Sequence, residues 1–475
     1  MAQYSFEKTE PEKAGVNSLR IINFIRRLER CGLDMHSVLL LKDKRLIFEG
    51  YYAPFERDTL HRMFSITKSF VSLAVGILAG RGEIDLDASI TEYFPEYEPK
   101  DGFHPYLKET TIRDMLSMTT PHNGTTFDKL SRSGWTESYF KKAPTHRPGT
   151  IFSYDTSASH TLAALVEKLS GKPLLDFLRD SGFREKGFSE EAYCLTDGAG
   201  VSRGGSGLMA KPIDILLAAD IVFSGGKGIV PKSYIDEAVA YHVPNFVKGS
   251  FIEEKQGYGY QFWRVRHGGY MMYGMAGQLA VCMPDKNLIL VTTADLTDRK
   301  DGMQLLFEAF WDELYLHIGE DIFSRPGKDE LKELLNGLEI KPLESKLTRT
   351  INGEYEFKDE NPLGLTKLKI SISESFGEAV LVRGGDIQKI VFGIGSMQRG
   401  VFNRYNCPYT ASGMWADNDT FAVRANLIGE CIGKVIMQFS FKKENAVTVF
   451  SRKTEETLFR EYAGFCSGVE MRLCY

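Results

Sequence analysis

The sequence has few cysteine and histidine residues that could stabilise the fold through disulfide bonds or metal ions. It contains seven cysteines in 475 residues, an odd number at wide spacing with no Cys-x-x-Cys pair. These features predict free thiols in a reducing compartment and exclude a disulfide framework or a zinc-ribbon site. The nine histidines include no His-Glu-x-x-His or His-x-x-x-His pair. We therefore expect no metal site and no cofactor.

Long apolar runs and an excess of basic charge are also missing. The N-terminal MAQYSFEKTEPEKAG has no apolar signal-peptide core. The longest apolar run, FVSLAVGILA, is about ten residues long, whereas a membrane span needs roughly 20. The net charge of −5 gives no basic surface for nucleic acid. We expect a cytoplasmic protein without a membrane span or a nucleic-acid partner; these features do not set the oligomeric state.

The length and the residue pattern predict two domains. A chain of 475 residues exceeds one ordinary domain. Residues 1–325 mix helical and strand patterns, and Pro326-Gly327 begins a linker with a short charged helix over 326–344. Residues 345–475 contain short alternating segments at roughly ten-residue spacing, which predict an all-β sandwich or small barrel.

The first 325 residues are expected to form an α+β domain, with an antiparallel sheet built from early and late strands and helices packed on it. A glycine-dense turn is expected at 198–207, and the loop-rich stretch 121–150 is expected to line a site. Expected helices cover 16–30, 110–120, 160–178, 212–224, 301–318 and the run from Ser65 to Gly80. Expected strands cover 37–43, 45–52 (turning at Asp43-Lys44), 258–265, 278–284 and 287–295.

One Ser-x-x-Lys motif differs from the others by its context. The pattern occurs at Ser5, Ser65, Ser138, Ser224 and Ser440. Only Ser65 begins an apolar helix, FSITKSFVSLAVGILAG, where residues three apart share a face and Lys68 can reach the serine hydroxyl. A serine becomes a nucleophile when a base takes its proton. The other interpretation, which this stretch alone leaves open, is a serine N-cap with a solvated lysine.

Two further stretches favour the interpretation of Ser65 as a catalytic nucleophile over that of an N-cap. FSYDTSASHTL places Tyr154 just before a helix, where its hydroxyl can move a proton if a lysine lowers its pKa. YMMYGMAGQLAV places Gly274 and Gly277 at the start of a strand, where a backbone N–H can approach a ligand closely. Taken singly, an aromatic residue packed at the start of a helix and a plain turn glycine remain alternatives.

In this order over residues 10–320, the three stretches resemble the serine β-lactamase and penicillin-binding family, which includes esterases and 6-aminohexanoate-dimer hydrolases. The resemblance implies a β-lactamase/transpeptidase-like α+β fold with a helical subdomain. It implies Ser65 as nucleophile, Lys68 as base and Tyr154 as acid/base, with the N–H groups of Ser65 and Met275 as the oxyanion hole. The β-rich region over residues 345–475 resembles the lipocalin-like barrels that some of these hydrolases carry.

The chain departs from the family pattern at two motifs. Thr156 stands where asparagine is usual, and Met272-Tyr273-Gly274 stands where Lys-Thr-Gly or His-x-Gly is usual. The cation that binds a substrate carboxylate is therefore missing. The resemblance then favours the esterase and 6-aminohexanoate-dimer hydrolase branch, a serine hydrolase acting through an acyl-enzyme on a small ester or amide. Expected pocket residues are Asp155, Thr156, Gly274 and Gln278, with His61 and Trp135 as weaker candidates.

Three other functions remain as alternatives. A β-lactamase or DD-peptidase-type enzyme would need a cation from elsewhere in the chain. A catalytically inactive binding protein on the same fold has no need for the whole set of Ser65, Lys68 and Tyr154. An α/β-hydrolase needs Gly-x-Ser-x-Gly, whereas the nearest stretch, GGSGL, ends in Leu208.

Overall fold

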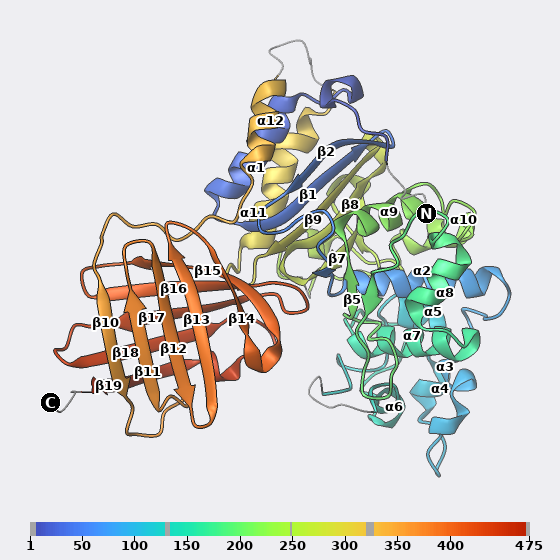
Figure 1. The fold of residues 1–475 in the computed structure, drawn as a ribbon. Helices are drawn as coiled ribbons and strands as arrows, with labels where there is room; N and C mark the ends of the chain where they lie inside the picture. Colours follow the sequence, from blue (N-terminus) through green and yellow to red (C-terminus); the bar gives the residue numbers. More distant parts are fainter. Residues whose placement is uncertain (1–5, 129–133, 248, 320–326, 472–475) are drawn as a thin grey trace. The chain divides into compact units, whose positions relative to one another are not determined.

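A computed structural model describes residues 6–128, 134–247, 249–319 and 327–471. The chain divides into two units, residues 1–338 and residues 339–475 (Figure 1). The stretch expected as a linker, 326–344, contains helix α12 (Lys328–Asn336), and the division follows that helix. Pro326, where the linker was expected to begin, lies outside the described residues.

A six-stranded antiparallel sheet forms the centre of the first unit. Its strand order is β2-β1-β9-β8-β7-β6. The strands are β1 (Asp34–Lys42), β2 (Arg45–Tyr51), β6 (Trp263–Arg264), β7 (Tyr270–Gly274), β8 (Gln278–Met283) and β9 (Leu288–Asp295). Asp43 and Lys44 join β1 to β2 with φ of 49° and 62°, as a two-residue hairpin turn requires. The expected strand 258–265 shrinks to the two residues of β6.

Side chains alternate between two cores on the two faces of this sheet. On β1, Leu39 and Leu41 belong to one core, and Val38 and Leu40 belong to the other. Helices α2 (Ile66–Gly80) and α9 (Pro212–Phe223) contribute to the first core. Helices α1 (Ser18–Arg30), α11 (Gly302–Ala309) and α12 contribute to the second. The early hairpin and the late strands thus form one sheet, as the α+β prediction required.

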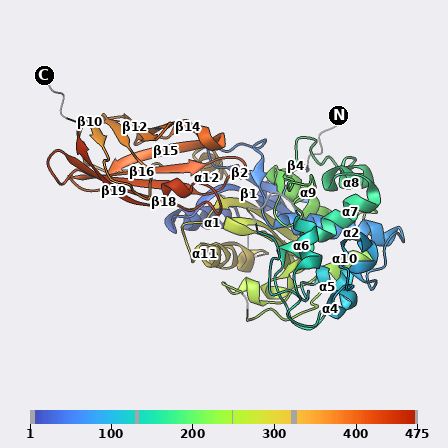
Figure 2. The ribbon, with the colours of Figure 1, turned by 90° about the horizontal axis from the view of Figure 1, so that it is seen from below.

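A helical subdomain lies beside the sheet. Its longest helix, α7 (Thr156–Ser170), packs against α2, and the two lie close together in Figures 1 and 2. Asp155 caps the start of α7, and Gly171, with φ of 68°, ends it. The expected single helix 160–178 is therefore two helices. The others are α3 (Ile90–Tyr93), α4 (Pro105–Glu109), α5 (Ile112–Leu116), α6 (Trp135–Lys141), α8 (Leu174–Leu178) and α10 (Lys232–Ala238).

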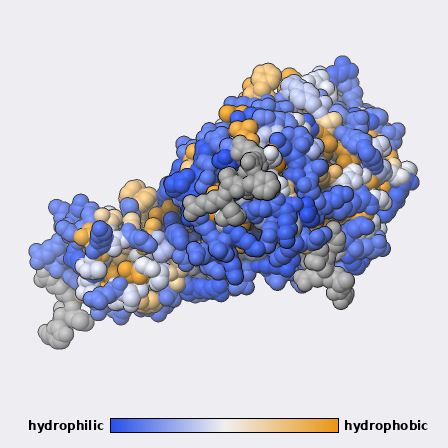
Figure 3. Space-filling view, turned by 90° about the horizontal axis from the view of Figure 1, so that it is seen from above, coloured by the Kyte–Doolittle hydropathy of each residue, from blue (hydrophilic) through white to orange (hydrophobic). Residues whose placement is uncertain are grey.

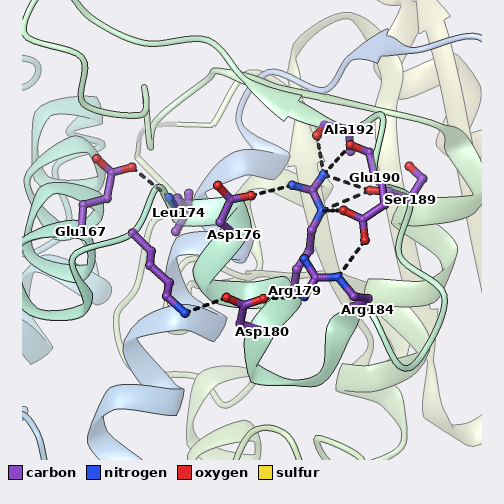
Figure 4. Close-up of polar contacts among 10 residues, drawn as sticks. Glu167, Leu174, Asp176, Arg179, Asp180, Arg184, Ser189, Glu190 and Ala192 are labelled. Carbon is purple, nitrogen blue, oxygen red and sulfur yellow. Dashed lines mark hydrogen bonds and ion pairs between the residues drawn. The ribbon is translucent and has the colours of Figure 1, made fainter.

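Polar contacts tie the segment after α7 to its neighbours (Figure 4). Arg179 donates hydrogen bonds to the backbone carbonyls of Ser189, Glu190 and Ala192. Glu167 of α7 accepts from the backbone N–H of Leu174. The chain after this segment enters a small sheet. Its strand order is β3-β5-β4, and its strands are β3 (His61–Arg62), β4 (Tyr193–Cys194) and β5 (Leu208–Ala210). Strand β3 ends three residues before the predicted nucleophile, Ser65.

The second unit is a β-barrel. Nine strands, in the order β13-β12-β11-β10-β19-β18-β17-β16-β15, close through a short parallel pairing of β13 with β15, and β14 pairs with β15 outside that closure. The strands are β10 (Ile351–Glu356), β11 (Lys367–Ile372), β12 (Phe376–Arg383), β13 (Asp386–Ile394), β14 (Gln398–Phe402), β15 (Cys407–Trp415), β16 (Thr420–Leu427), β17 (Lys434–Ser440), β18 (Ala446–Lys453) and β19 (Gly464–Glu470). The expected all-β tail is confirmed.

The distribution of hydrophobic residues bears on whether a helix could span a membrane. On the face drawn in Figure 3, hydrophilic residues predominate and hydrophobic residues form separate patches. Among the residues with described positions, no helix combines the length and the apolar composition needed to cross a membrane.

Candidate active site

Ser65 lies at the N-terminal end of α2, where the chain makes a sharp change of direction. The preceding residue, Phe64, has a left-handed φ of 46°, a conformation that a bulky side chain rarely adopts. The Thr67 hydroxyl donates to the Phe64 carbonyl at 2.5 Å and accepts from the Leu208 N–H at 3.0 Å. These bonds hold the strained residue in place and fix the position of the Ser65 hydroxyl.

Lys68 is buried one turn further along α2, with 1% of its surface exposed. Its Nζ atom lies 3.2 Å from the Ser65 hydroxyl, 2.6 Å from the Gly205 carbonyl oxygen and 3.4 Å from the Thr156 hydroxyl. It also lies 4.9 Å from the centroid of the Tyr154 ring. These three oxygens belong to uncharged groups, and together they hold the amine against the serine. In its neutral form it is placed to accept the Ser65 proton.

Tyr154 completes the group around the serine. Its hydroxyl hydrogen-bonds with that of Ser65. Burial raises the pKa of Tyr154 well above its ordinary value, and the hydrogen bond with Ser65 lowers that pKa only in part. Tyr154 keeps its proton at neutral pH and can donate it.

Aromatic rings form a wall beside Tyr154. The Trp263 ring centroid lies 5.4 Å from that of Tyr154 and 5.8 Å from that of Tyr273. Tyr258 packs edge-on against Tyr154 at 6.4 Å. The wall removes water from one side of the site and leaves it mainly apolar.

Two residues that follow Tyr154 were expected in the pocket, and the structure places them differently. The Thr156 hydroxyl lies against Lys68, as described above. Asp155 is fully buried and accepts hydrogen bonds from the Ser157 N–H at 2.8 Å and the Thr120 hydroxyl at 3.1 Å. Burial raises the pKa of Asp155 to about 6. Asp155 therefore caps the start of α7, and its expected place in the pocket stays a prediction.

The backbone at Gly205, in the glycine-rich segment before β5, passes very close to Thr156 and Lys68. A Cβ atom at this position would lie 2.2 Å from the Thr156 Cγ2 atom and 3.4 Å from Lys68 Nζ. Only glycine allows the backbone to bring its carbonyl to the lysine. The segment is held at its start by Asp197, whose carboxylate accepts from the N–H groups of Ala199 at 2.9 Å and Val201 at 3.0 Å.

The turn after β7 comes close to the nucleophile. A Cβ atom at Gly274 would lie 2.2 Å from the Met63 carbonyl oxygen, so glycine is required where β7 meets the chain leading to Ser65. Figure 1 shows α2 and β7 close together. Met275 follows directly, which brings its backbone near the start of α2.

Gln278 braces this turn from within. Its side-chain amide donates to the carbonyls of Met275 at 2.9 Å and Ala294 at 2.8 Å and accepts from the Ala294 N–H at 3.1 Å. The Thr292 hydroxyl donates to the Gly277 carbonyl at 2.8 Å. Gln278 is fully buried and positions the turn, and its expected place in the pocket stays a prediction.

The two weaker candidates for the pocket, His61 and Trp135, have their described contacts away from Ser65 and Lys68. His61 is buried and lies 2.6 Å from His36 between ring nitrogens. Trp135 begins α6, inside the stretch expected as a loop, and stacks on Phe127 at 4.0 Å. In another Ser-x-x-Lys motif, the Ser138 hydroxyl bonds to the Trp135 carbonyl at 2.6 Å. None of these contacts involves Ser65 or Lys68.

Sequence reasoning missed two participants. The Gly205 carbonyl is the nearest described partner of Lys68, and its only signal was the density of glycines at 198–207. Glu254 hydrogen-bonds to the Tyr273 hydroxyl, and its charge acts on Tyr154. No motif marks Glu254, because tertiary folding alone brings it to the site.

Comparisons with known proteins identify the family to which the chain belongs. The profile of one protein family, described as beta-lactamase, matches residues 25–308, more than half of the chain. Esterase EstB of Burkholderia gladioli is 33% identical over 160 residues, covering 28% of this chain and 40% of that protein. The 6-aminohexanoate-dimer hydrolase of Paenarthrobacter ureafaciens is 23% identical over 239 residues, covering 46% of this chain and 60% of that protein. The chain therefore matches less than two thirds of either relative's length.

One solved structure extends the likeness of the fold to the second unit. The crystal structure of SurE with D-Leu covers 97% of this chain and 99% of its own, with a TM-score of 0.50 and 16% sequence identity. At this identity the likeness concerns the fold alone.

Proposed function

Since the chain belongs to the β-lactamase family, we propose that it is a serine hydrolase that cleaves a small ester or amide through an acyl-enzyme. The observation that carries the proposal is the position of buried Lys68, with Nζ 3.2 Å from the Ser65 hydroxyl. Tyr154 hydrogen-bonds with the same hydroxyl. A nucleophile, a base and a proton donor thus meet at one oxygen atom.

The first step forms the acyl-enzyme. Neutral Lys68 takes the Ser65 proton, and the serine oxygen attacks the substrate carbonyl carbon. The resulting oxyanion binds the N–H groups of Ser65 and Met275. Tyr154 donates its proton to the leaving oxygen or nitrogen as that bond breaks, and the proton on Lys68 restores the tyrosine.

The second step releases the acyl group. A water molecule gives a proton to Lys68, and the resulting hydroxide attacks the ester carbonyl at Ser65. The same two N–H groups hold the second oxyanion. When it collapses, the Ser65 oxygen leaves and regains a proton, and the carboxylic acid departs.

The strand beside the site bears on the class of substrate. Strand β7 has the sequence YMMYG and carries no basic residue, and Met272 is buried in an apolar core. A substrate carboxylate would find no cation on this strand. This favours an ester or amide over a β-lactam or a cell-wall peptide, in line with an esterase and an amide hydrolase as distant relatives.

Turnover of two substrates tests the proposal. We expect the protein to hydrolyse p-nitrophenyl butyrate with kcat/KM well above its value for nitrocefin, and Ser65→Ala to abolish both reactions. Ser440→Ala, a Ser-x-x-Lys serine on β17 of the second unit, is the matched control and should retain full activity. Preference for nitrocefin would instead favour a β-lactamase. Failure of the folded wild type to hydrolyse either substrate would favour a binding protein.

A further inference from the structure

A carboxylate lies at the far end of the aromatic wall beside Tyr154. Glu254 is half-buried, and its Oε2 atom accepts the Ser250 N–H at 2.6 Å. Its carboxylate also accepts a hydrogen bond from the Tyr273 hydroxyl. Tyr273 is the residue directly before Gly274, so Glu254 is joined to the strand that leads into the Met275 turn.

Glu254 also influences the predicted proton donor. Its charge acts on both Tyr154 and Tyr273 and raises the pKa of each, in addition to the larger effect of burial. A negative charge near a proton donor makes the loss of that proton harder. A positive charge bound between them would offset this effect.

The rings near Glu254 suit a cation. The Phe251 and Trp263 rings flank Tyr273, with centroid distances of 5.6 and 5.8 Å. Trp263 in turn reaches Tyr154. Aromatic faces attract alkylammonium groups, and a carboxylate at the edge of such a set adds charge attraction. Lys255, the nearby basic residue that acts on Glu254, is exposed.

We infer that Glu254, Tyr273 and Trp263 form a subsite for a positively charged leaving group, so that the preferred substrates are esters or amides of an amino alcohol or a diamine. The inference rests on the proposed function and narrows it. The leaving group is the part of the substrate concerned, because Tyr154, beside which the subsite lies, delivers the leaving-group proton. The ammonium group binds by charge and ring contacts and takes no part in bond breaking.

The test uses two substrates of the same shape that differ in charge. Butyrylthiocholine carries a trimethylammonium group on its leaving thiol, and S-(3,3-dimethylbutyl) thiobutyrate replaces the nitrogen by carbon. Thiol release is measured for the wild type, Glu254→Gln and Glu333→Gln. Glu333, an exposed residue of α12, is the charge-matched control. Thermal unfolding of each variant checks that it is folded.

We expect the wild type and Glu333→Gln to favour the cationic substrate about tenfold in kcat/KM, mostly through KM. The ratio should fall close to one in Glu254→Gln, and in the wild type it should fall as salt is raised. An equal ratio in the wild type and folded Glu254→Gln, or a wild-type preference for the neutral substrate, overturns the inference and leaves the proposed hydrolase intact. Failure to cleave either thioester, together with no turnover of p-nitrophenyl butyrate, overturns both.

Discussion

The Nζ atom of Lys68 lies 2.6 Å from the carbonyl oxygen of Gly205, closer than its 3.2 Å distance to the Ser65 hydroxyl. The lysine is thus anchored by a backbone atom and presented to the serine. A backbone carbonyl orients the amine without supplying the full negative charge of a carboxylate, which would favour the ammonium form strongly. The roles proposed for Lys68 and Gly205 can therefore each be tested by substitution.

Replacing Lys68 by methionine removes the proposed base while keeping a side chain of similar length in the buried position. We expect kcat/KM for p-nitrophenyl butyrate to fall by about 10²–10⁴, the usual contribution of a general base. Lys346→Met, at an exposed position of the second unit, is the control and should behave as wild type. Full activity in folded Lys68→Met would show that another group deprotonates Ser65.

Gly205→Ala tests the close approach of the glycine-rich segment. The new Cβ would lie 2.2 Å from the Thr156 Cγ2 atom. We expect a stability loss of about 1–3 kcal/mol and at least a tenfold loss of kcat, because the carbonyl moves away from Lys68. Gly385→Ala, at a position with open space around it, should change neither.

A second substitution separates the clash from other effects of Gly205→Ala. Thr156→Ser removes the clashing methyl group but keeps the hydroxyl that faces Lys68. The double variant should therefore recover part of the activity and stability lost by Gly205→Ala alone. No recovery would mean that the methyl contact does not set the position of this segment, since the Thr156 carbonyl, 3.1 Å from the added carbon, would remain as the obstacle.

Gln278→Leu tests whether the turn after β7 must be braced. The substitution leaves the Met275 and Ala294 carbonyls and the Ala294 N–H without their buried partner. We expect a loss of stability of about 2–4 kcal/mol. We also expect kcat to fall by about 10² with a small change in KM, because the proposed contact of the Met275 N–H is with the oxyanion alone. A variant with normal kcat and lower stability would confine Gln278 to a structural role.

The stability of the first unit should depend on pH below neutrality. Burial lowers the pKa of His61 and of His122 to about 4, from an ordinary value of 6.5. Between these values the unfolded chain binds more protons than the folded one, so the free energy of unfolding falls as pH falls. Each histidine accounts for about 3 kcal/mol at most. Asp155 acts in the opposite sense between about pH 6 and 3.8, because its folded pKa is raised.

Urea unfolding at pH 7 and pH 4.5, followed by tryptophan fluorescence, measures this dependence. The wild type should be less stable at pH 4.5, and His122→Gln should lose less stability than the wild type between the two values. Asp155→Asn should lose more, because the carboxyl that offsets the histidines is gone. Equal wild-type stability at the two pH values would contradict the buried, neutral state of these histidines.

Local patterns explain which parts of the fold were predictable. The Asp43-Lys44 hairpin, the apolar helix after Ser65 and the alternating tail each follow from residues close together in the sequence, and the structure confirms them. The strand expected over 258–265 is reduced to β6, since Tyr258 and Tyr260 are buried aromatic residues of the wall and the core that mimic a strand pattern. Strand β14 is only five residues long, pairs with β15 and carried no clear signal.

The site was predictable only where chemistry and local structure coincide. Ser65 and Lys68 share one helix face, so their contact follows from spacing, and Tyr154 stands at a helix start; their catalytic roles remain predictions. The Gly205 carbonyl and Glu254 come from segments more than 130 residues beyond Ser65 in the chain, and only tertiary folding brings them to the site. Asp155 and Gln278 were expected in the pocket because they adjoin motif residues; the structure shows that the first caps a helix and the second braces a turn.

The most direct measurement is the intact mass of the protein after incubation with a fluorophosphonate probe, with peptide mapping of the adduct. The account predicts a single adduct on Ser65 in the wild type, the same adduct in Ser440→Ala, a slower one in Lys68→Met and none in Ser65→Ala. An adduct on a different serine, or no adduct on folded wild-type protein, would contradict the assignment of Ser65 as an activated nucleophile.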